Sequence, residues 1–384
     1  MRDNLPPELA SLKSDALRVS PADWAGRQGW KLKRSGKSLA GPCPRCGGED
    51  RFAIDAPTGK WNCRGCCVGG YDVISLVMHM EERRFVDALQ RITGRRPDKA
   101  PDPAKLARDM AAAERAAAER EHEATKRREW ARRDAFKLWH GLPPANGHVA
   151  AYLTARNIDT DLGALARAIR ESAALAYWHG REKIHIGPAM VAAIQFANGI
   201  FAGIHRTWLD PDQPKGKVIL PDPSGKIDKK TGKTELLPAK KTMGTKGNGA
   251  IRLYTPIDCA TLVVGEGIET TLTPYVHARR EKTAYWCGVD LGHIAGRAMR
   301  DGNHKPVADQ PDMTDEQCFA VPPDMARRLT EIIFLADADS DSQKTRDAMT
   351  RAARRQMRRF PNLTVKIAWP EAGGDFNDMA MRDD

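Results

Sequence analysis

Residues 331–343 read EIIFLADADSDSQ, and this stretch predicts the architecture of the C-terminal part of the chain. The apolar run at 332–335 is typical of a buried strand. Asp337, Asp339 and Asp341 follow it at intervals of two residues. Because side chains alternate along an extended chain, these three carboxylates point to the same side and repel one another. The arrangement therefore requires a positive charge close by.

The segments around this strand repeat a pattern of strand followed by helix. ATLVVGEG at 260–267 precedes a helical pattern at 268–280, and TAYWCGV at 283–289 is a further strand. After 331–343 come a helical pattern at 342–360 and the strand LTVKIAWP at 363–370. Alternation of this kind predicts an α/β core, in which helices cover a parallel sheet.

Carboxylates follow several of these strands. Glu266 ends one strand in a Gly-x-Gly turn, and Asp375 and Asp378 follow another. In parallel sheets, ligand sites gather at the carboxyl ends of the strands, and hard oxygen donors suit Mg²⁺ or Mn²⁺. We therefore predict a divalent metal site centred on Glu266, Asp337 and Asp339, with Asp341, Asp375 and Asp378 as supporting ligands. The alternative is a separate solvated acidic loop after each strand.

Five of the eight cysteines lie between positions 43 and 67. Cys43-x2-Cys46 and Cys63-x2-Cys66 are separated by sixteen residues, a spacing that predicts a tetrahedral structural zinc site in a small ribbon. Cys67 breaks the x2 spacing, so it is a weaker candidate than Cys66. Four thiolates leave the metal no open position, which argues against a catalytic role for these cysteines.

The chain is basic, with 61 Lys and Arg against 50 Asp and Glu and a formal net charge of +11, which favours polyanionic partners. Basic residues surround the cysteines, and Trp61 and Arg64 are candidates for contact with nucleic acid. Packing of Trp61 in the core of the ribbon is an equal alternative. With no apolar run near membrane-spanning length and no signal-peptide core, we expect a soluble, cytoplasmic protein without a membrane partner.

Four segments are predicted along the chain. Residues 1–97 form a zinc-ribbon domain, and 98–139 a linker followed by a long charged helix. Residues 140–257 form an α+β subdomain with a hairpin at 189–209 around the turn ANG, and 258–384 form the α/β core. The helical segment 346–359 carries six arginines, for which we consider DNA contact and, with greater weight, a solvated face.

At this point the residues resemble a known family. The Glu of GEG at 265–267, the Asp-x-Asp at 337–339 and the order of strands resemble the Toprim domain, which topoisomerases, DnaG-type primases and some nucleases share. GGDFND at 373–378 is similar to a Gly-x-Asp-x-Asp segment of the primases, although here the second carboxylate, Asp378, follows Asn377. The segments 198–208 and 238–244 resemble the primase N-terminal subdomain, whose basic residues face nucleotide and template. The positions that match are Arg206, Lys240 and Lys241.

Together with the zinc ribbon, this order resembles the primases of phages and plasmids. The resemblance implies a DNA primase that makes short RNA primers on single-stranded DNA by two-metal nucleotidyl transfer. Structural Zn²⁺, catalytic Mg²⁺ or Mn²⁺, nucleoside triphosphates and a separate replicative helicase are the implied cofactors and partners. Glu266, Asp337 and Asp339 would be the catalytic residues. The alternatives are a Toprim metal-dependent nuclease and a zinc-ribbon DNA-binding module with an inactive Toprim domain. The three core carboxylates argue against the inactive module, and the ribbon favours primase over nuclease.

Overall fold

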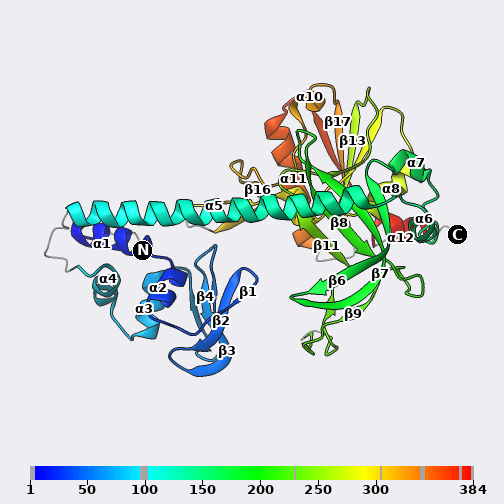
Figure 1. Cartoon of the computed structure of the whole chain (residues 1–384). Coiled ribbons are helices and arrows are strands. Elements are labelled where there is room, and N and C mark those ends of the chain that lie inside the picture. The colour runs from blue at the N-terminus through cyan, green and yellow to red at the C-terminus, as the bar shows by residue number, and fades with distance from the viewer. Residues whose placement is uncertain are drawn as a thin grey trace. The chain divides into compact units, whose positions relative to one another are not determined.

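The computed structural model describes residues 5–95, 103–228, 231–302, 305–337, 342–371 and 374–381. The chain divides into two compact units, Met1–Glu119 and Arg120–Asp384 (Figure 1). The boundary falls inside the helix α5 (Pro103–Gly141), which belongs in part to each unit. The predicted charged helix is thus confirmed, and it extends slightly beyond the predicted end at 139. No helix in the described ranges is long and apolar enough to span a bilayer.

The first unit is a five-stranded antiparallel meander flanked by short helices. Its strands pair in chain order: β1 (Lys33–Ser35), β2 (Ser38–Cys43), β3 (Gly47–Asp55), β4 (Trp61–Cys63) and β5 (Val68–Gly70). Helices α1 (Pro7–Leu17), α2 (Pro21–Arg27), α3 (Val73–Met80) and α4 (Phe85–Thr93) complete it. Asp72 caps α3 by accepting from the N–H of Ser75, and Gly94 ends α4 in the left-handed conformation that favours glycine.

A four-stranded antiparallel sheet begins the second unit. Its order is β11 (Lys240–Gly244), β8 (Phe201–Trp208), β7 (Glu182–Gln195), β6 (Ile169–His179). β7 and β8 form the predicted hairpin, which is confirmed. Helices α6 (Gly147–Thr154) and α7 (Leu162–Leu165) precede the sheet, and a two-stranded ribbon of β9 (Leu220–Pro221) and β10 (Leu236–Leu237) is inserted before β11. One face of the sheet packs on the C-terminal part of α5 through Ala135 and Trp139.

The second sheet is the predicted parallel core. Its order is β12 (Ile251–Tyr254), β14 (Thr283–Cys287), β13 (Thr261–Gly265), β17 (Glu331–Leu335), β18 (Thr364–Ala368). The last four strands are mutually parallel, as the alternation of strand and helix predicts. β12 joins as an antiparallel edge, which the sequence analysis did not predict.

Helices and one hairpin accompany the parallel sheet. They are α8 (Ile268–His277), α9 (Leu291–Ala295), α10 (Pro323–Ala326), α11 (Ser342–Arg359), α12 (Phe376–Ala380) and the hairpin β15 (Ala298–Arg300) with β16 (Pro306–Pro311). Met349 and Ala352 of α11 pack on one face of the sheet with Leu262 and Phe334. These helix and strand side chains are buried against one another, so α11 covers this face of the sheet.

The two sheets of the second unit share a hydrophobic core. Val149 of α6 and Ile194 of β7 lie in the same buried cluster as Ile251, Leu272 and Leu335. The cluster therefore joins the segments predicted separately as 140–257 and 258–384. This shared core positions the antiparallel sheet against the parallel one, and the polar residues between them form the site described next.

Candidate functional site

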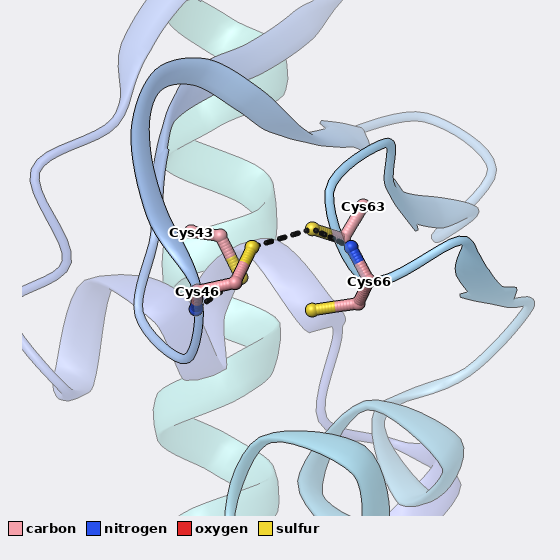
Figure 2. A group of neighbouring side chains, drawn as sticks. All are labelled: Cys43, Cys46, Cys63 and Cys66. Carbon is pink, nitrogen blue, oxygen red and sulfur yellow. Dashed lines mark hydrogen bonds between the residues drawn. The ribbon is translucent and has the colours of Figure 1, made fainter.

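Four cysteines of the first unit converge on one point (Figure 2). Cys43 and Cys63 end β2 and β4, while Cys46 and Cys66 lie in the turns that follow. Their Sγ atoms all lie within 4.8 Å of one another, and those of Cys46 and Cys63 are 3.4 Å apart. The N–H of Cys66 donates to the Sγ of Cys63 at 3.3 Å, and the N–H of Cys46 to that of Cys43 at 3.5 Å. Four thiols gathered in this way, on two tight turns, fit a structural zinc ion.

Cys67 lies outside this cluster. Its backbone is in the left-handed region (φ 56°), and its thiol contacts the carbonyl of Arg64. The four cysteines that converge are therefore those predicted from the x2 spacing, with Cys66 and not Cys67 as the fourth member. Because a unit of this size has a small hydrophobic core, a metal at the end of the sheet would add folding energy that the core lacks.

Trp61 is buried in the ribbon, with only 3% of its surface exposed. Its Nε1–H lies within hydrogen-bond distance of the carbonyl of Asp72 (3.2 Å) and of the Ser75 hydroxyl (3.1 Å). The predicted stacking of a base on Trp61 is therefore not supported by this structure, and the alternative of core packing describes it. Arg64 is exposed and donates to the Asp50 carboxylate at 2.9 Å.

Tyr71 is an exposed aromatic residue of the ribbon that the sequence analysis missed. It is 74% exposed, and the Lys60 ammonium lies 5.1 Å from the centroid of its ring. Tyr71 directly follows Gly70, the last residue of β5, which pairs with Trp61. An aromatic residue immediately after a Gly-Gly strand end is the signal that could have identified it.

Glu266 and Asp337 lie at the same edge of the parallel sheet. β13 and β17 pair in register up to Val264 and Phe334, and both carboxylates follow the ends of these strands. Neither is fully buried. The topology therefore brings these two predicted metal ligands to neighbouring strand ends. Asp339 and Asp341 lie outside the described residues.

Asp375 and Asp378 make a capping box at the start of α12. The side chain of Asp375 accepts from the N–H of Asp378 at 2.7 Å, and the Asp378 carboxylate accepts from the N–H of Asp375 at 3.4 Å. These two aspartates thus have a local structural role that the sequence analysis did not include. Among the described residues, only the four cysteines bring three or more metal-binding atoms within 4.8 Å of one another. By donor type the carboxylates suit Mg²⁺ or Mn²⁺, and Glu266 and Asp337, which follow neighbouring strands, are the described residues that would hold it.

A further carboxylate, Asp290, was missed by the sequence analysis. It follows β14, which is parallel to β13, and it caps α9 by accepting from the N–H of His293. Its carboxylate pairs with the Lys246 ammonium at 2.5 Å. Burial raises the pKa of Asp290, but the hydrogen bonds from Lys246 and His293 outweigh it, and the pKa lies below its ordinary value. The sequence did contain a signal for Asp290, because this aspartate closely follows the strand pattern TAYWC at 283–287.

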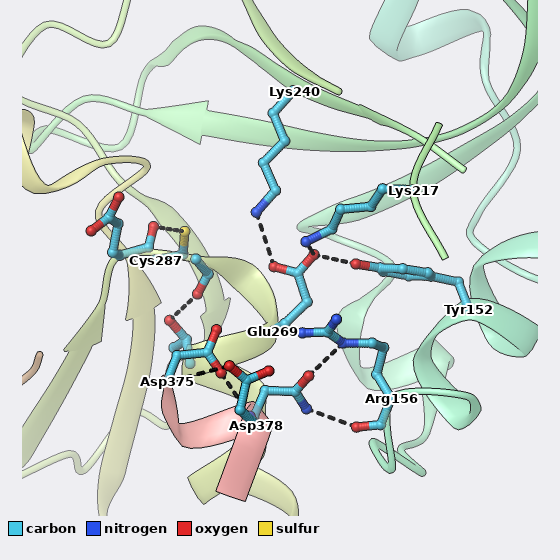
Figure 3. Close-up of polar contacts among 12 residues, drawn as sticks. Tyr152, Arg156, Lys217, Lys240, Glu269, Cys287, Asp375 and Asp378 are labelled. Carbon is cyan, nitrogen blue, oxygen red and sulfur yellow. Dashed lines mark hydrogen bonds and ion pairs between the residues drawn. The ribbon is translucent and has the colours of Figure 1, made fainter. Parts of the chain in front are cut away.

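Glu269 is buried between the two sheets, with 2% of its surface exposed (Figure 3). It is the second residue of α8, and its carboxylate pairs with the ammonium groups of Lys217 at 3.0 Å and Lys240 at 3.1 Å. The Tyr152 hydroxyl of α6 donates to the same carboxylate at 2.5 Å. Burial raises the pKa of Glu269, but the two lysines and Tyr152 hold it well below its ordinary range. The sequence analysis did not identify Glu269, Lys217 or Tyr152 as part of a site.

Arg206 and Lys241 lie on the other face of the antiparallel sheet. The two residues are paired across β8 and β11. The Lys241 ammonium is 3.9 Å from the ring centroid of Tyr177, and the Arg206 guanidinium is 5.2 Å from that of Trp208. Both aromatic rings belong to the core that packs on α5. The structure therefore divides the predicted nucleotide-binding set between two faces of the sheet, and Lys240 alone among these three pairs with Glu269.

The arginines of α11 have partners in the chain. Arg355 is fully buried and donates to the carbonyl of Asp312 at 2.9 Å, and Arg351 donates to that of Gly296 at 3.0 Å. Arg354 pairs with Asp309, and Arg358 donates to Gln310 at 2.6 Å. These four side chains attach the segment 295–312, with its β15–β16 hairpin, to the helix. The buried Arg355 is therefore not part of a solvated face, whereas Arg358 is exposed, and DNA contact by this helix stays a prediction.

Comparison with known proteins gives a partial family match and several structural similarities. The model of a domain of unknown function, DUF7146, matches residues 129–253. No curated protein is significantly similar to the chain in sequence. The chain is similar to the zinc-binding and RNA polymerase domains of the Aquifex aeolicus primase, with 14% identity, a TM-score of 0.33, and coverage of 98% of this chain and 83% of that one.

Two further structures are similar at the same level. The primase fragment of the bacteriophage T7 primase-helicase protein has 13% identity and a TM-score of 0.34, over 90% of this chain and 94% of that one. A DnaG primase catalytic domain bound to single-stranded DNA has 13% identity and a TM-score of 0.38, over 67% and 79%.

Proposed function

We propose that this chain is a DNA primase of the phage or plasmid kind, which synthesises short RNA primers on a single-stranded DNA template. The observation that supports it best is the edge of the parallel sheet. There Glu266 and Asp337 follow neighbouring strands, and the Lys240 ammonium lies close to Gly267, the residue after Glu266. Carboxylates for a divalent metal and a cation for phosphate are what phosphoryl transfer requires.

In the proposed reaction, a nucleotide 3′-hydroxyl attacks the α-phosphate of a nucleoside triphosphate. A phosphorus–oxygen bond forms, the bond to the β-phosphate oxygen breaks, and pyrophosphate leaves. Divalent metal, when bound, supplies stabilisation of the charge that develops on the phosphate oxygens. Glu266 and Asp337, together with the predicted ligand Asp339, would hold that metal, and Glu266 would also accept the proton of the attacking hydroxyl. Asp341, Asp375 and Asp378 remain predicted supporting ligands, with Asp375 and Asp378 also capping α12.

The first unit contributes template binding in this proposal. Its zinc site would hold the ribbon together, and exposed basic residues such as Lys60 and Arg64 would contact phosphates of the single strand. Arg206 and Lys241 lie on the far face of the antiparallel sheet, so any phosphate that they bind would be a second one, away from Glu266 and Asp337. We assign none of the described residues to contact with a helicase partner.

The test is synthesis on single-stranded templates of varied sequence, with labelled nucleotides and Mg²⁺ or Mn²⁺. Wild type should produce short oligonucleotides. Asp337→Asn and Glu266→Gln should lose at least about a hundredfold in rate while binding single-stranded DNA as tightly as wild type, because they remove metal ligands rather than template contacts.

Glu331→Gln is the matched control. Glu331 begins the same strand that Asp337 follows, so it lies at the opposite edge of the sheet, and its substitution should leave the rate within a few-fold of wild type. The rival is a metal-dependent nuclease built on the same carboxylates. Shortening of labelled DNA by wild type, with no primer on any template, would replace the primase proposal by the nuclease.

A further inference from the structure

The C-terminal part of α5 has two different sides. Ala135 and Trp139 are buried and pack on the antiparallel sheet of the second unit. Trp130 precedes them by five and nine residues, so at 3.6 residues per turn it lies on the opposite side of the helix. There 69% of its surface is exposed. A single exposed apolar residue is common on protein surfaces, so the neighbours of Trp130 decide what it means.

Positively charged side chains accompany Trp130 on the exposed side. Residues three and four apart on a helix are neighbours, and this spacing leads from Trp130 to Lys126, Arg133 and Lys137. His140 continues the same spacing, and all of these residues are exposed. We call Lys126, Trp130, Arg133, Lys137 and His140 the stripe. At 1.5 Å per residue it extends for about 21 Å along the helix.

The charge on this side of the helix is positive after its carboxylates are counted. Glu123 pairs with Lys126 at 3.6 Å, and Asp134 lies beside the stripe. Neither Arg133 nor Lys137 forms an ion pair with another residue that the structure describes. Their charges are therefore available to a polyanion that approaches from solvent.

A second aromatic surface lies at the end of the stripe. The ring of Phe136, which is 48% exposed, stacks on that of His140, with 5.6 Å between the centroids and 16° between the planes. The ring of Phe201 in β8 contacts Phe136 edge-on at 5.3 Å, which fixes the pair against the sheet. Trp130 and His140 are ten residues apart, about 15 Å along the helix, and the two unpaired cations lie between them.

We propose that the stripe binds a single strand of nucleic acid. Bases stack on Trp130 and on the Phe136–His140 pair, and phosphates contact the cations between them. Aromatic platforms combined with cations are the usual means of binding single strands. A duplex offers its phosphates but keeps its bases paired inside, so it would leave the aromatic rings uncovered. The inference deepens the proposed function, on which the identity of the strand as template rests, but the contact itself needs neither nucleotide nor catalytic metal.

Association of α5 with a second copy is the rival explanation. Alternating spacings of four and three residues are those of a coiled-coil seam, which requires mostly apolar residues. Three of the five residues of the stripe are Lys or Arg. A second copy would bring these cations together in the seam, whereas a nucleic-acid strand neutralises them.

Fluorescence anisotropy of labelled oligothymidine with the full-length chain, without nucleotides, tests the proposal. Trp130→Ala should lower the affinity about fivefold or more, because a stacked base is lost, and Trp130→Phe should stay within about threefold of wild type. Arg133→Gln should weaken binding and reduce the slope of log affinity against log salt by about 0.7.

Arg128→Gln is the matched control. Arg128 is on the same helix and exposed, but it lies on the other side from Trp130 and pairs with Glu121 at 2.5 Å. Its substitution removes the same charge as Arg133→Gln and should leave the affinity within about twofold. Contact is measured directly by tryptophan fluorescence, whose quenching by oligothymidine should be smaller in Trp130→Phe than in wild type.

The other outcomes overturn the proposal. They are unchanged affinity in Trp130→Ala, equal losses in Arg133→Gln and Arg128→Gln, and quenching that is the same in Trp130→Phe as in wild type. Duplex or polyglutamate that binds as tightly as oligothymidine would assign the stripe to another polyanion. Sedimentation that shows a dimer of wild type and a monomer of Trp130→Ala would assign it to a second copy.

The proposed function is tested separately by primer synthesis. If the chain makes primers and Trp130→Ala binds oligothymidine as wild type does, the stripe is wrong and the function stands. If binding depends on the stripe but no primer is made on any template, the stripe stands as a nucleic-acid site and the primase proposal fails.

Discussion

Lys240 and Lys241 are consecutive residues of β11, yet their ammonium groups lie on opposite faces of the sheet. The ammonium of Lys240 is 3.1 Å from the Glu269 carboxylate, whereas that of Lys241 is 3.9 Å from the ring centroid of Tyr177. Successive side chains of a strand necessarily diverge in this way. Because both residues are lysines in one strand, they form a matched pair for testing which face carries the chemistry.

Lys240→Gln should lower kcat/KM for primer synthesis by about a hundredfold or more, because it removes the cation beside Gly267. Lys241→Gln should lower it less than about fivefold, since its side chain packs on Tyr177 of the core against α5. Steady-state synthesis at varied nucleotide concentration measures both. An equal loss of kcat/KM in the two variants would contradict the assignment of the phosphate contact to the face that carries Lys240.

The cysteine cluster should bind one zinc ion per chain, and Cys63→Ser should abolish it. The first unit should then unfold while the second remains folded, because the three hydrophobic clusters of the second unit contain no residue of the first. Metal analysis and calorimetric unfolding are the measurements. Cys67→Ser is the control and should retain zinc, since Cys67 lies outside the cluster. Purified wild type with well under one equivalent of zinc contradicts the prediction.

If the ribbon binds single-stranded DNA, Tyr71→Ala should weaken binding by about 1–3 kcal/mol, the usual contribution of a stacked base. Trp61→Phe should instead lower the stability of the ribbon, because its Nε1–H bonds to Asp72 and Ser75 are lost, and leave DNA affinity within about twofold. Fluorescence anisotropy at two salt concentrations measures affinity and its salt dependence. Normal DNA binding by Tyr71→Ala excludes stacking on this residue.

Glu269→Gln should lower the pKa of Lys217. Burial lowers the pKa of Lys217, and the negative charge of Glu269 opposes that shift, while Lys240 and Arg156 add to it. Without the carboxylate, the pKa of Lys217 falls further. A lysine loses its proton as pH rises through its pKa, so the Lys217 ammonium of the variant should deprotonate at a lower pH than that of wild type. NMR titration of the lysine Nζ signals measures the difference.

Wild type is the control. Arg156 is the further cationic group that acts on Lys217, and it is the same in both proteins. Tyr152, Cys287 and His205 also lie near the lysines, and burial shifts the pKa of each toward its neutral form. Parallel pH profiles for wild type and Glu269→Gln would show that the carboxylate does not maintain the charge of Lys217.

Local spacing was sufficient to predict part of this protein. The cluster of four cysteines follows from two Cys-x2-Cys turns, since each turn is formed by a few consecutive residues. The parallel sheet follows from apolar runs that alternate with helical patterns, and the placement of Glu266 and Asp337 at one edge follows from the direction of parallel strands. These features depend on residues close in sequence or on a general rule of topology.

The sequence by itself predicted the cluster of four cysteines, the alternation of strand and helix, and the edge of the sheet at which Glu266 and Asp337 lie. Only the tertiary structure decided that Trp61 is in the core while Tyr71 is exposed, and that Lys240 and Lys241 have separate surroundings. It also brought Tyr152, Lys217 and Lys240 around Glu269, from segments more than a hundred residues apart at the extremes. The physical reason is that burial and ion pairing depend on which surfaces pack together, and packing between two sheets is set by the whole chain rather than by any short stretch of it.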